Sequence, residues 1–240
     1  MKKLSVIIPA YNEAHRIEKT LFSVSEFLKK QAYESEILVV SDGSTDNTSH
    51  IISNLKSRIP NLVFFENLDN HGKGWVVKQG MLKASGDVRV FMDADNSTKI
   101  EEISNFLPLF DQGYSVVIGS RRVQGAVIAE HQGVLRDFLG GVFRLIVHTL
   151  VPVGVTDSQC GFKAFSAKSV EVIFSRQKIF RWAFDVELLA IARKFKFKIK
   201  EMPITWVNDG ESHVKFGGMV RMLLEIIQIR INLWTGSYND

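Results

Sequence analysis

Two hydrophobic patterns alternate along the first half of this 240-residue chain. Short apolar runs, which are typical of buried strands, are separated by longer segments that have the apolar spacing of a helix. The expected strands are Leu4–Ala10, Glu36–Val40, Leu62–Glu66, Val88–Met92 and Val116–Ile118, and the expected helices are Ala14–Lys30, one that ends at Lys56, Lys73–Ala84 and Lys99–Phe110. This alternation predicts an α/β fold, with a mostly parallel sheet that helices cover on both faces.

Polar motifs follow several of these strands at the point where each strand ends. They are Tyr11–Glu13, Asp42–Thr48, Asp93–Asn96 and Ser120–Arg122. In sheets of this type, ligands bind beyond the carboxyl ends of the strands. One such motif would suit an ordinary loop, but several at the same sheet edge predict a binding site.

The pair Asp93 and Asp95 is the strongest candidate for chemistry at this edge. Side chains alternate along an extended strand, so the two carboxylates are expected to point the same way and Ala94 the other. Two neighbouring carboxylates are costly without a cation, and hard oxygen ligands suit Mg²⁺ or Mn²⁺. The motif alone fits a solvated turn equally well. Its place beside the other polar motifs favours a metal site.

The regular alternation stops after Gly125. The second half is expected to contain an apolar helix, a polar loop-and-strand segment, a second helix, an edge strand and an amphipathic helix. These segments are Arg136–Leu150, Thr156–Phe165, Arg181–Phe195, Lys198–Ile204 and Gly217–Trp234. Because no linker, repeat or low-complexity tract separates the halves, we expect a single domain over residues 1–240.

Composition bounds the partners and the compartment. The net charge of +4 and the isoelectric point near 9.1 fit an anionic substrate or an anionic membrane surface, and no pattern of a nucleic-acid reader is present. The single Cys160 excludes an internal disulfide and suits a reducing, cytoplasmic compartment. No secretory signal is expected at the N-terminus. The apolar segment Phe138–Val155 contains Arg144, His148 and Pro152, so we expect no membrane span.

Several motifs together resemble a known family. The segments Val6–Glu13, Asp42–Thr48 and Asp93–Asp95 resemble the signature of family 2 glycosyltransferases. Thr156–Lys163 and Arg181–Leu189 resemble the dolichyl-phosphate or polyprenyl-phosphate β-glucosyltransferase branch, which is related to dolichyl-phosphate mannosyltransferases. The resemblance covers essentially the whole chain. It implies a GT-A (Rossmann-like) fold with a C-terminal acceptor-side extension, and a hexosyltransferase activity.

The resemblance also implies roles for individual residues on the donor side. Residues 1–124 would form the half that binds the nucleotide sugar, with UDP-glucose as the expected donor, and residues 125–240 the half that binds the acceptor. Asp93 and Asp95 would carry Mg²⁺ or Mn²⁺ on the diphosphate. The expected nucleotide-sugar residues are Pro9, Tyr11, Asn12, Glu13, Asp42, Ser44, Asp93 and Ala94.

On the acceptor side, the resemblance implies a polyprenyl or dolichyl phosphate that is bound by Arg121 and Arg136. Lys163 and Arg181 would add positive charge to bring two anions together. A phosphate acceptor is already a nucleophile and needs no strong base, whereas a sugar hydroxyl needs one. For a hydroxyl acceptor we expect Asp157 to be the base and Asp185 to be second. The bland alternatives are that Asp157 caps a turn and that Asp185 pairs with Arg181 on one helix face.

The chain departs from the family pattern in places. Ser41 stands where an Asp often precedes Asp42, and Glu211–His213 stands where relatives carry Gly-Ser-Lys. Eukaryotic relatives usually carry an N-terminal membrane helix, and none is expected here. Lys73 is expected chiefly to start a helix, although it could also approach the donor.

Other functions stay open on the sequence alone. A family 2 enzyme could act on a sugar hydroxyl in polysaccharide or glycolipid synthesis, and a protein of another class would bind a nucleotide sugar without transferring it. The C-terminal helix, with Lys215, Arg221 and Arg230 nearby, either packs on the core or lies on a membrane surface. The oligomeric state is not indicated.

Overall fold

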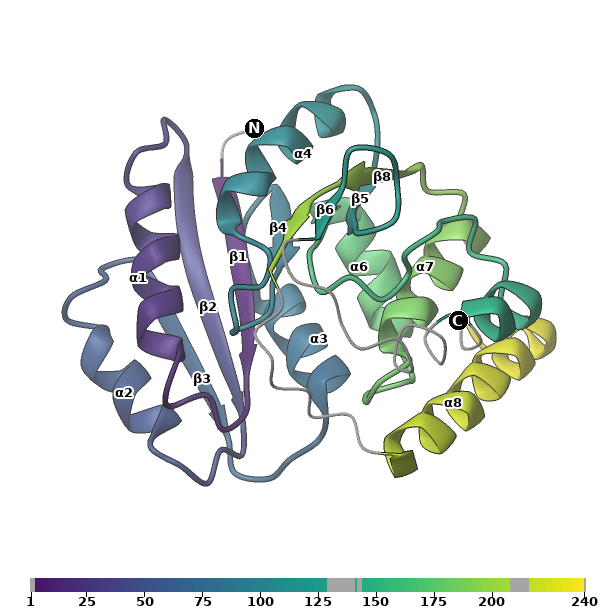
Figure 1. Cartoon of the computed structure of the whole chain (residues 1–240), viewed down its shortest axis with the longest axis horizontal. Helices are drawn as coiled ribbons and strands as arrows, with labels where there is room; N and C mark the ends of the chain where they lie inside the picture. Colours follow the sequence, from purple (N-terminus) through teal and green to yellow (C-terminus); the bar gives the residue numbers. More distant parts are fainter. Residues whose placement is uncertain (1–2, 129–140, 142–143, 208–215, 240) are drawn as a thin grey trace.

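The computed structural model describes residues 3–128, 141, 144–207 and 216–239. Its main sheet has seven strands in the order β3-β2-β1-β4-β7-β5-β8 (Figure 1). All neighbouring strands pair in parallel except β7, which is antiparallel to both β4 and β5. This confirms the predicted α/β fold with a mostly parallel sheet. The strands are β1 Lys3–Ala10, β2 Glu34–Asp42, β3 Leu62–Asn67, β4 Val88–Phe91, β5 Val116–Ser120, β7 Lys163–Ser166 and β8 Ile199–Pro203.

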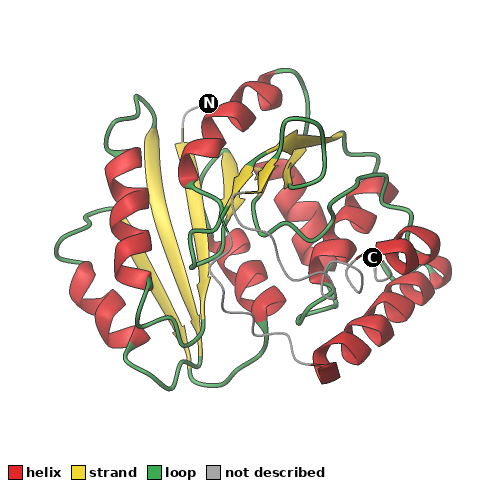
Figure 2. Ribbon diagram, in the orientation of Figure 1, coloured by secondary structure: helices red, strands yellow, loops and turns green. Residues whose placement is uncertain are grey.

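Helices cover both faces of the sheet (Figure 2). Along β1, Leu4, Val6 and Ile8 pack into one buried cluster with α1, α2 and α4, while Ile7 points to the other cluster, with α3, α6 and α7. Side chains of a strand alternate between faces, so each face has its own core. The helices are α1 Ile17–Leu28, α2 Thr48–Leu55, α3 Lys73–Lys83, the short η1 Ile100–Glu102 and α4 Ile103–Asp111, then α6 Ala167–Arg176, α7 Phe184–Lys194 and α8 Phe216–Thr235.

Some boundaries differ from those expected. The helix expected from Arg181 begins at Phe184, because the backbone N–H groups of Trp182 and Ala183 donate to the carboxylate of Glu225 on α8. Of the helix expected before residue 150, residues 144–150 are helical, and most of its beginning lies outside the described residues. The expected edge strand is β8, at the end of the sheet.

A small second sheet was not expected. It pairs β6 (Val127–Ile128) with β9 (Thr205–Trp206) in parallel. These two-residue strands lie near the carboxyl ends of β5 and β8, and Ile204 N donates to Ser120 O at 3.2 Å. The pair is too short to produce a pattern in the sequence, because strand periodicity needs about four residues or more.

Glu187 on α7 ties the C-terminal segment to the core. Its side chain is fully buried and accepts hydrogen bonds from the backbone N–H groups of Lys178 and Ile179, at 3.0 and 2.8 Å. The hydroxyl of Tyr238 donates to the same carboxylate at 2.7 Å. Burial raises the pKa of Glu187 to about 7, although these donors favour its charged form.

We expect this glutamate to make the stability of the protein pH-dependent. Its pKa rises from 4.5 in the unfolded chain to about 7 in the folded one, so folding favours the protonated form. The stabilisation is full below pH ~4.5 and is lost as the pH rises through about 7, by about 3 kcal/mol in the limit. Urea unfolding between pH 5 and pH 8 measures this loss.

The matched variant is Glu187→Gln, which cannot titrate. Its free energy of unfolding, whatever its absolute value, should change less with pH over this window than that of the wild type. Equal pH slopes for the two proteins would contradict the assignment.

Candidate active site

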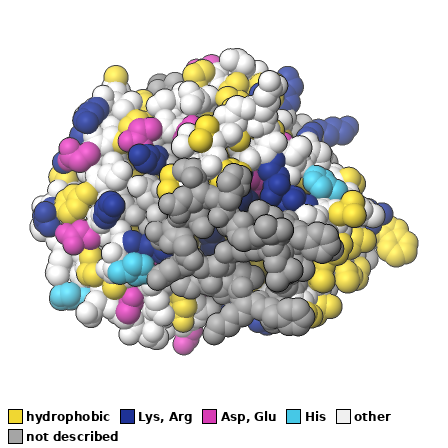
Figure 3. All heavy atoms as spheres, in the orientation of Figure 1, with side chains coloured by type: hydrophobic (Ala, Val, Ile, Leu, Met, Phe, Trp, Pro, Cys, Tyr) yellow, Lys and Arg dark blue, Asp and Glu magenta, His cyan; other side chains and the backbone are white. Residues whose placement is uncertain are grey.

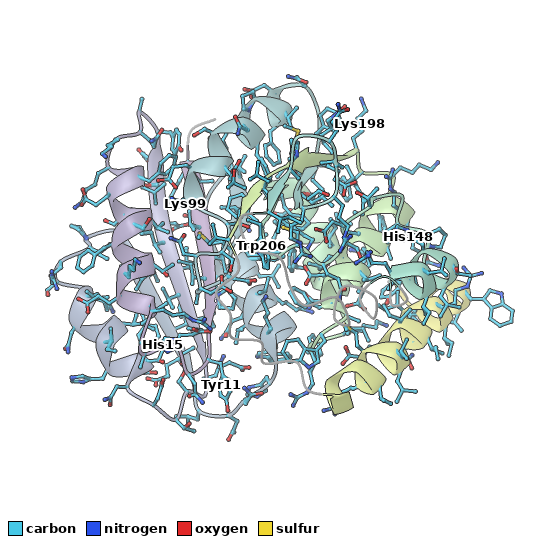
Figure 4. All side chains as sticks on the ribbon, viewed as in Figure 1. Tyr11, His15, Lys99, His148, Lys198 and Trp206 are labelled. Atoms are coloured by element: carbon cyan, nitrogen blue, oxygen red, sulfur yellow. The ribbon has the colours of Figure 1, made fainter. Side chains whose placement is uncertain are left out.

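The polar motifs that follow β1, β2 and β4 do lie at one edge of the sheet, because these strands are parallel neighbours. Tyr11 lies just beyond the end of β1, and Trp206 lies nearer the middle of the molecule (Figure 4). β5 is separated from β4 by the antiparallel β7, so Arg121 approaches the same edge from the other side of that strand.

The loops after β1 and β2 are bonded to each other. Asn12 Oδ1 accepts a hydrogen bond from Thr45 N at 2.8 Å, and Asn12 N donates to Ser44 Oγ at 3.2 Å. Asn12 has a positive φ of 55°, a conformation that Asn tolerates better than most residues. Glu13 N donates to Thr48 Oγ1 at 2.7 Å. The two loops therefore form one rigid rim, on which Tyr11 remains exposed.

Asp42 and Glu13, both expected to contact the nucleotide, have protein partners in this structure. The buried carboxylate of Asp42 accepts hydrogen bonds from His71 N and Gly72 N, each at 2.8 Å. Glu13 forms an ion pair with Arg16. Asp42 therefore fixes the entrance to α3, a role that sequence reasoning missed because the partners lie about thirty residues away.

The geometry of Asp93 and Asp95 corrects the argument from strand alternation. β4 ends at Phe91, and the two aspartates follow in a turn in which Asn96 N donates to Asp93 O at 3.4 Å. Asp95 Oδ1 accepts from Ser97 N at 2.9 Å. Burial, and next the charge of Asp93, raise the pKa of Asp95. The two carboxylates are thus close enough to interact, although a turn and not a strand brings them together.

Gly161 forms a close wall behind Asp93. A β-carbon added at Gly161 would lie 2.1 Å from Asp93 Oδ2, a distance that no side chain could accept. Gly161 precedes β7, and β7 pairs with β4, so the antiparallel strand brings this glycine under the carboxylate. The absence of a side chain at this position leaves the space that Asp93 occupies.

Lys73 faces Asp93 from the start of α3. Its Nζ lies 2.5 Å from Asp93 Oδ1. Burial alone would lower the pKa of this ammonium, but the carboxylates of Asp93, Asp185 and Asp95 raise it above its ordinary value. Lys73 does start the helix, as expected, and it also reaches Asp93, a contact that sequence reasoning did not predict. Its approach to the donor stays a prediction.

The carboxylate oxygens of the two aspartates are suitable ligands for a divalent cation such as Mg²⁺ or Mn²⁺. Among the described residues, no group of three or more His, Cys, Asp and Glu side chains could hold a metal ion. Mg²⁺ is commonly bound by one or two carboxylates together with substrate phosphates and waters, and needs no complete protein cage. Asp93 and Asp95 therefore suit an ion that arrives with a diphosphate.

Arg121 is held rigidly by Asp157. Its Nε and one terminal nitrogen donate to the two carboxylate oxygens at 2.7 and 2.9 Å, and its backbone N donates to the same group at 3.0 Å. The guanidinium lies 5.5 Å from the ring centre of Trp206. Asp157 is 2% exposed, and its own N–H donates to Glu201 at 2.8 Å. The charged fork of Arg121 is thus fixed in one orientation.

This pairing disfavours Asp157 as a base. Burial would raise the pKa of Asp157, but the bonds and charge of Arg121 lower it below its ordinary value. A carboxylate with a lowered pKa accepts a proton poorly. The role of Asp157 in this structure is to hold Arg121. Neither the prediction that Asp157 is a base nor the alternative that it caps a turn included this contact.

Lys163 and Asp185 bind each other in the interior. Lys163 is fully buried, and its ammonium bonds to Asp185 Oδ1 and to Cys160 O. The alternative in which Asp185 pairs with Arg181 is therefore wrong, since Arg181 precedes α7 and Asp185 takes Lys163. Burial raises the pKa of Asp185, and Lys163 offsets part of that rise. Because Lys163 is fully buried and bonded to Asp185, its ammonium is not exposed to an acceptor phosphate.

The remaining predicted residues are placed only in part. Pro9 lies in β1, next to its last residue, and Ala94 is buried between the two aspartates in the sequence. Arg181 is half-buried beside Gly72. Arg136 and the segment 211–213 lie outside the described residues.

Comparison with known proteins defines the class. Residues 5–174 match the model of Glycosyl transferase family 2. The chain therefore belongs to this family of glycosyltransferases, as the sequence motifs predicted.

Individual relatives narrow the comparison. Dolichyl-phosphate beta-glucosyltransferase ALG5C of Trichomonas vaginalis is 36% identical, over 95% of this chain and 72% of that protein. The human dolichyl-phosphate beta-glucosyltransferase is 31% identical, over 99% of this chain and 78% of that protein. The chain is thus similar to dolichyl-phosphate β-glucosyltransferases over nearly its whole length.

Solved structures support the fold. Glucosyl-3-phosphoglycerate synthase of Mycobacterium tuberculosis, in complex with Mn²⁺, UDP-glucose and phosphoglyceric acid, superposes with a TM-score of 0.71 at 18% identity, over 97% of this chain and 79% of that one. TarS of S. aureus superposes with a TM-score of 0.60 at 18% identity, over 97% of this chain and 72% of that one. The GT-A fold expected from the resemblance is confirmed.

The wall behind Asp93 generates a prediction. Gly161→Ala should displace the Asp93 carboxylate, because the new methyl group would overlap Asp93 Oδ2. We expect Mn²⁺ binding in the presence of UDP to weaken by about 10- to 100-fold, as for other changes that reorient a metal ligand. Electron paramagnetic resonance of free Mn²⁺ measures this binding.

The matched control is Gly141→Ala, whose added methyl group, among the described residues, meets the end of the Arg144 side chain at 3.5 Å. It should bind Mn²⁺ as the wild type does. Unchanged Mn²⁺ binding in a folded Gly161→Ala protein would contradict the role given to this glycine.

Proposed function

We propose that this protein transfers glucose from UDP-glucose to a polyprenyl or dolichyl phosphate, with inversion at the anomeric carbon and with Mg²⁺ or Mn²⁺ as cofactor. The observation that carries the proposal is the state of Asp157. The carboxylate best placed to serve as a base is bound by Arg121 and has a lowered pKa. A fixed guanidinium beside a carboxylate that accepts a proton poorly suits an anionic acceptor.

The names of the relatives support the same donor and acceptor. Proteins 30–36% identical over nearly the whole chain are named dolichyl-phosphate β-glucosyltransferases. The M. tuberculosis structure of the same fold was solved with Mn²⁺ and UDP-glucose. The base and ribose would lie on the rim formed by Pro9, Tyr11, Asn12, Glu13, Asp42 and Ser44, with Ala94 beside the diphosphate.

The residues of this chain would divide the work as follows. Asp93 and Asp95 would hold the divalent ion, which when bound stabilises the negative charge of the departing diphosphate. Arg121, held by Asp157, would orient the acceptor phosphate opposite that leaving group. Asp185 is neutralised by Lys163 and keeps the interior beneath the site electrically balanced. Arg136 and Arg181 stay candidates for further acceptor contacts.

A hydroxyl acceptor, as in polysaccharide or glycolipid synthesis, is the second candidate. Its supporting observation is Asp185, whose pKa is raised by burial and is therefore nearer the range of an effective base. Its ion pair with Lys163 argues against free proton transfer. The third candidate is a protein that binds a nucleotide sugar without transferring it. The intact pair of Asp93 and Asp95 argues against this candidate.

The product distinguishes these candidates. The full chain is incubated with labelled UDP-glucose, Mn²⁺ and a short polyprenyl phosphate. We expect a lipid-soluble product from which mild acid releases glucose, as for a sugar joined to a phosphate. An acid-stable glycoside would support the hydroxyl acceptor, and absence of both transfer and hydrolysis would support the binding protein.

Arg121→Ala tests the acceptor side of the same assay. Loss of a charge-assisted bond should lower kcat/KM for the polyprenyl phosphate by about 10- to 100-fold. The KM for UDP-glucose should change little. The control is Arg122→Ala, since Arg122 is the exposed neighbour. An equal loss in both variants would contradict the assignment of Arg121.

We also propose that α8 lies on a membrane surface, where a polyprenyl acceptor would be found, and that the protein is peripheral on the cytoplasmic face. None of the described helices is long and apolar enough to cross a bilayer. Apolar side chains nevertheless gather at the right-hand edge of the molecule, where α8 lies (Figure 3). The exposed stripe on α8 consists of Val220, Leu224, Ile227, Ile231 and Trp234.

The spacing of this stripe follows one helix face, and Trp234 is 88% exposed at its end. Core packing accounts for the opposite face, where Met222, Ile226 and Ile229 are buried. The buried face shows the core packing, and the exposed apolar face supports the proposed contact with a membrane surface. Arg221 and Arg230 belong to the same helix and could contact anionic headgroups.

A flotation experiment with anionic liposomes tests the membrane proposal. Leu224→Glu with Trp234→Glu should abolish co-flotation, because charged groups cannot enter the apolar boundary of the bilayer. Leu82→Glu, on the exposed side of α3, is the control and should float as the wild type does. Wild-type protein that stays in solution would contradict the proposal.

A further inference from the structure

Lys73 occupies the place at which a cation would meet Asp93. Its Nζ is 2.5 Å from Asp93 Oδ1, and about a third of each side chain is exposed, 30% for Lys73 and 34% for Asp93. The other oxygen, Oδ2, lies against the backbone of Gly161. Both oxygens of the first aspartate are therefore occupied in the ligand-free protein, one by charge and one by packing.

The charged end of Lys73 is free to change rotamer, because its side chain is 30% exposed. Lys73 is the first residue of α3, and its flexible stem carries a compact charge that can move by several ångströms through rotamer changes. The backbone next to it is fixed, since Gly72 N donates to Asp42 Oδ2 at 2.8 Å. The base of the side chain is therefore anchored, while its charged end is partly exposed.

We propose that Lys73 exchanges partners when the donor binds. Its ammonium neutralises Asp93 in the free protein, and it moves to the diphosphate when the nucleotide and the divalent ion enter. The inference rests on the proposed metal and nucleotide-sugar site, and it adds that the two ligands bind cooperatively because one lysine stands between them.

The exchange has a thermodynamic consequence. Without nucleotide, a divalent ion must break the ion pair between Lys73 and Asp93 with no replacement for it, so the ion binds weakly. With nucleotide, the displaced ammonium gains phosphate oxygens. Each ligand then tightens the other by the same factor, since such coupling is reciprocal.

A simple alternative is that Lys73 is a fixed positive charge. In that case, removing it would tighten divalent ions equally with and without nucleotide, and the coupling would not change. Under the exchange, removal tightens the ion chiefly in the absence of nucleotide, so the coupling falls. The coupling factor, and not the affinity alone, separates the two.

The experiment measures Mn²⁺ binding to the full chain by electron paramagnetic resonance, with and without saturating UDP, and with correction for Mn²⁺ bound to free UDP. In the wild type we expect UDP to tighten Mn²⁺ by more than about fivefold. In Lys73→Met, UDP-free binding should tighten by about fivefold or more, and the coupling factor should fall by a similar amount.

Controls match the change in charge and in fold. Lys83→Met removes a lysine from the same helix at an exposed position and should leave both affinities unchanged. Lys73→Gln repeats the test with a polar side chain, and thermal melts confirm that each variant is folded. Asp93→Asn should lose Mn²⁺ binding with and without UDP.

The outcomes are distinct. An undiminished coupling factor in Lys73→Met and Lys73→Gln overturns the exchange, as does a wild type in which UDP leaves the Mn²⁺ affinity unchanged. If Asp93→Asn meanwhile loses Mn²⁺, the proposed metal site stands and only the exchange fails. Mn²⁺ binding that Asp93→Asn retains would overturn the metal site and the exchange with it.

Discussion

Charge balance between paired lysines and aspartates is the interaction on which the edge of this sheet depends. Lys163 neutralises Asp185, and Lys73 neutralises Asp93. An unpaired charge at the depth of Lys163 and Asp185 would cost several kcal/mol. The acidic pair that sequence patterns single out is thus stabilised by the ammonium that α3 supplies to Asp93 and by the Ser97 N–H that donates to Asp95.

The antiparallel strand makes this balance geometrically feasible. In β7, Lys163 pairs with Phe91 of β4 and with Ile118 of β5, so the start of β7 lies at the edge where those strands end. A parallel strand in that position would deliver its last residue there. The antiparallel direction instead delivers the preceding segment, so that Asp157 meets Arg121 and Gly161 meets Asp93. One reversed strand therefore links Arg121 and Asp93 at this edge.

Local patterns were enough to predict the fold and the edge, and not enough to predict the pairings. Strand and helix periodicities act over a few residues, which is why the alternation of the first half and the position of Asp93 were predicted correctly. The partners of Lys163, Asp157 and Asp42 lie 22 to 36 residues away and depend on how strands are ordered. Lys163 was predicted to contact phosphate from its residue type alone, because the sequence does not show that this side chain is buried. Gly161 lies in no periodic pattern, and the helical pattern that begins at Lys73 does not reveal the contact of that lysine with Asp93.

The same pairings bear on the chemistry that the site can perform. A hydroxyl nucleophile needs a group that takes its proton, and such a group works best with a pKa near the working pH. Arg121 lowers the pKa of Asp157, and Lys163 is bonded to Asp185, so these two carboxylates each have a cation as partner. A nucleophile that arrives already charged needs no such group and gains from the fixed guanidinium of Arg121. This arrangement of charges therefore suits an anionic acceptor better than a hydroxyl acceptor.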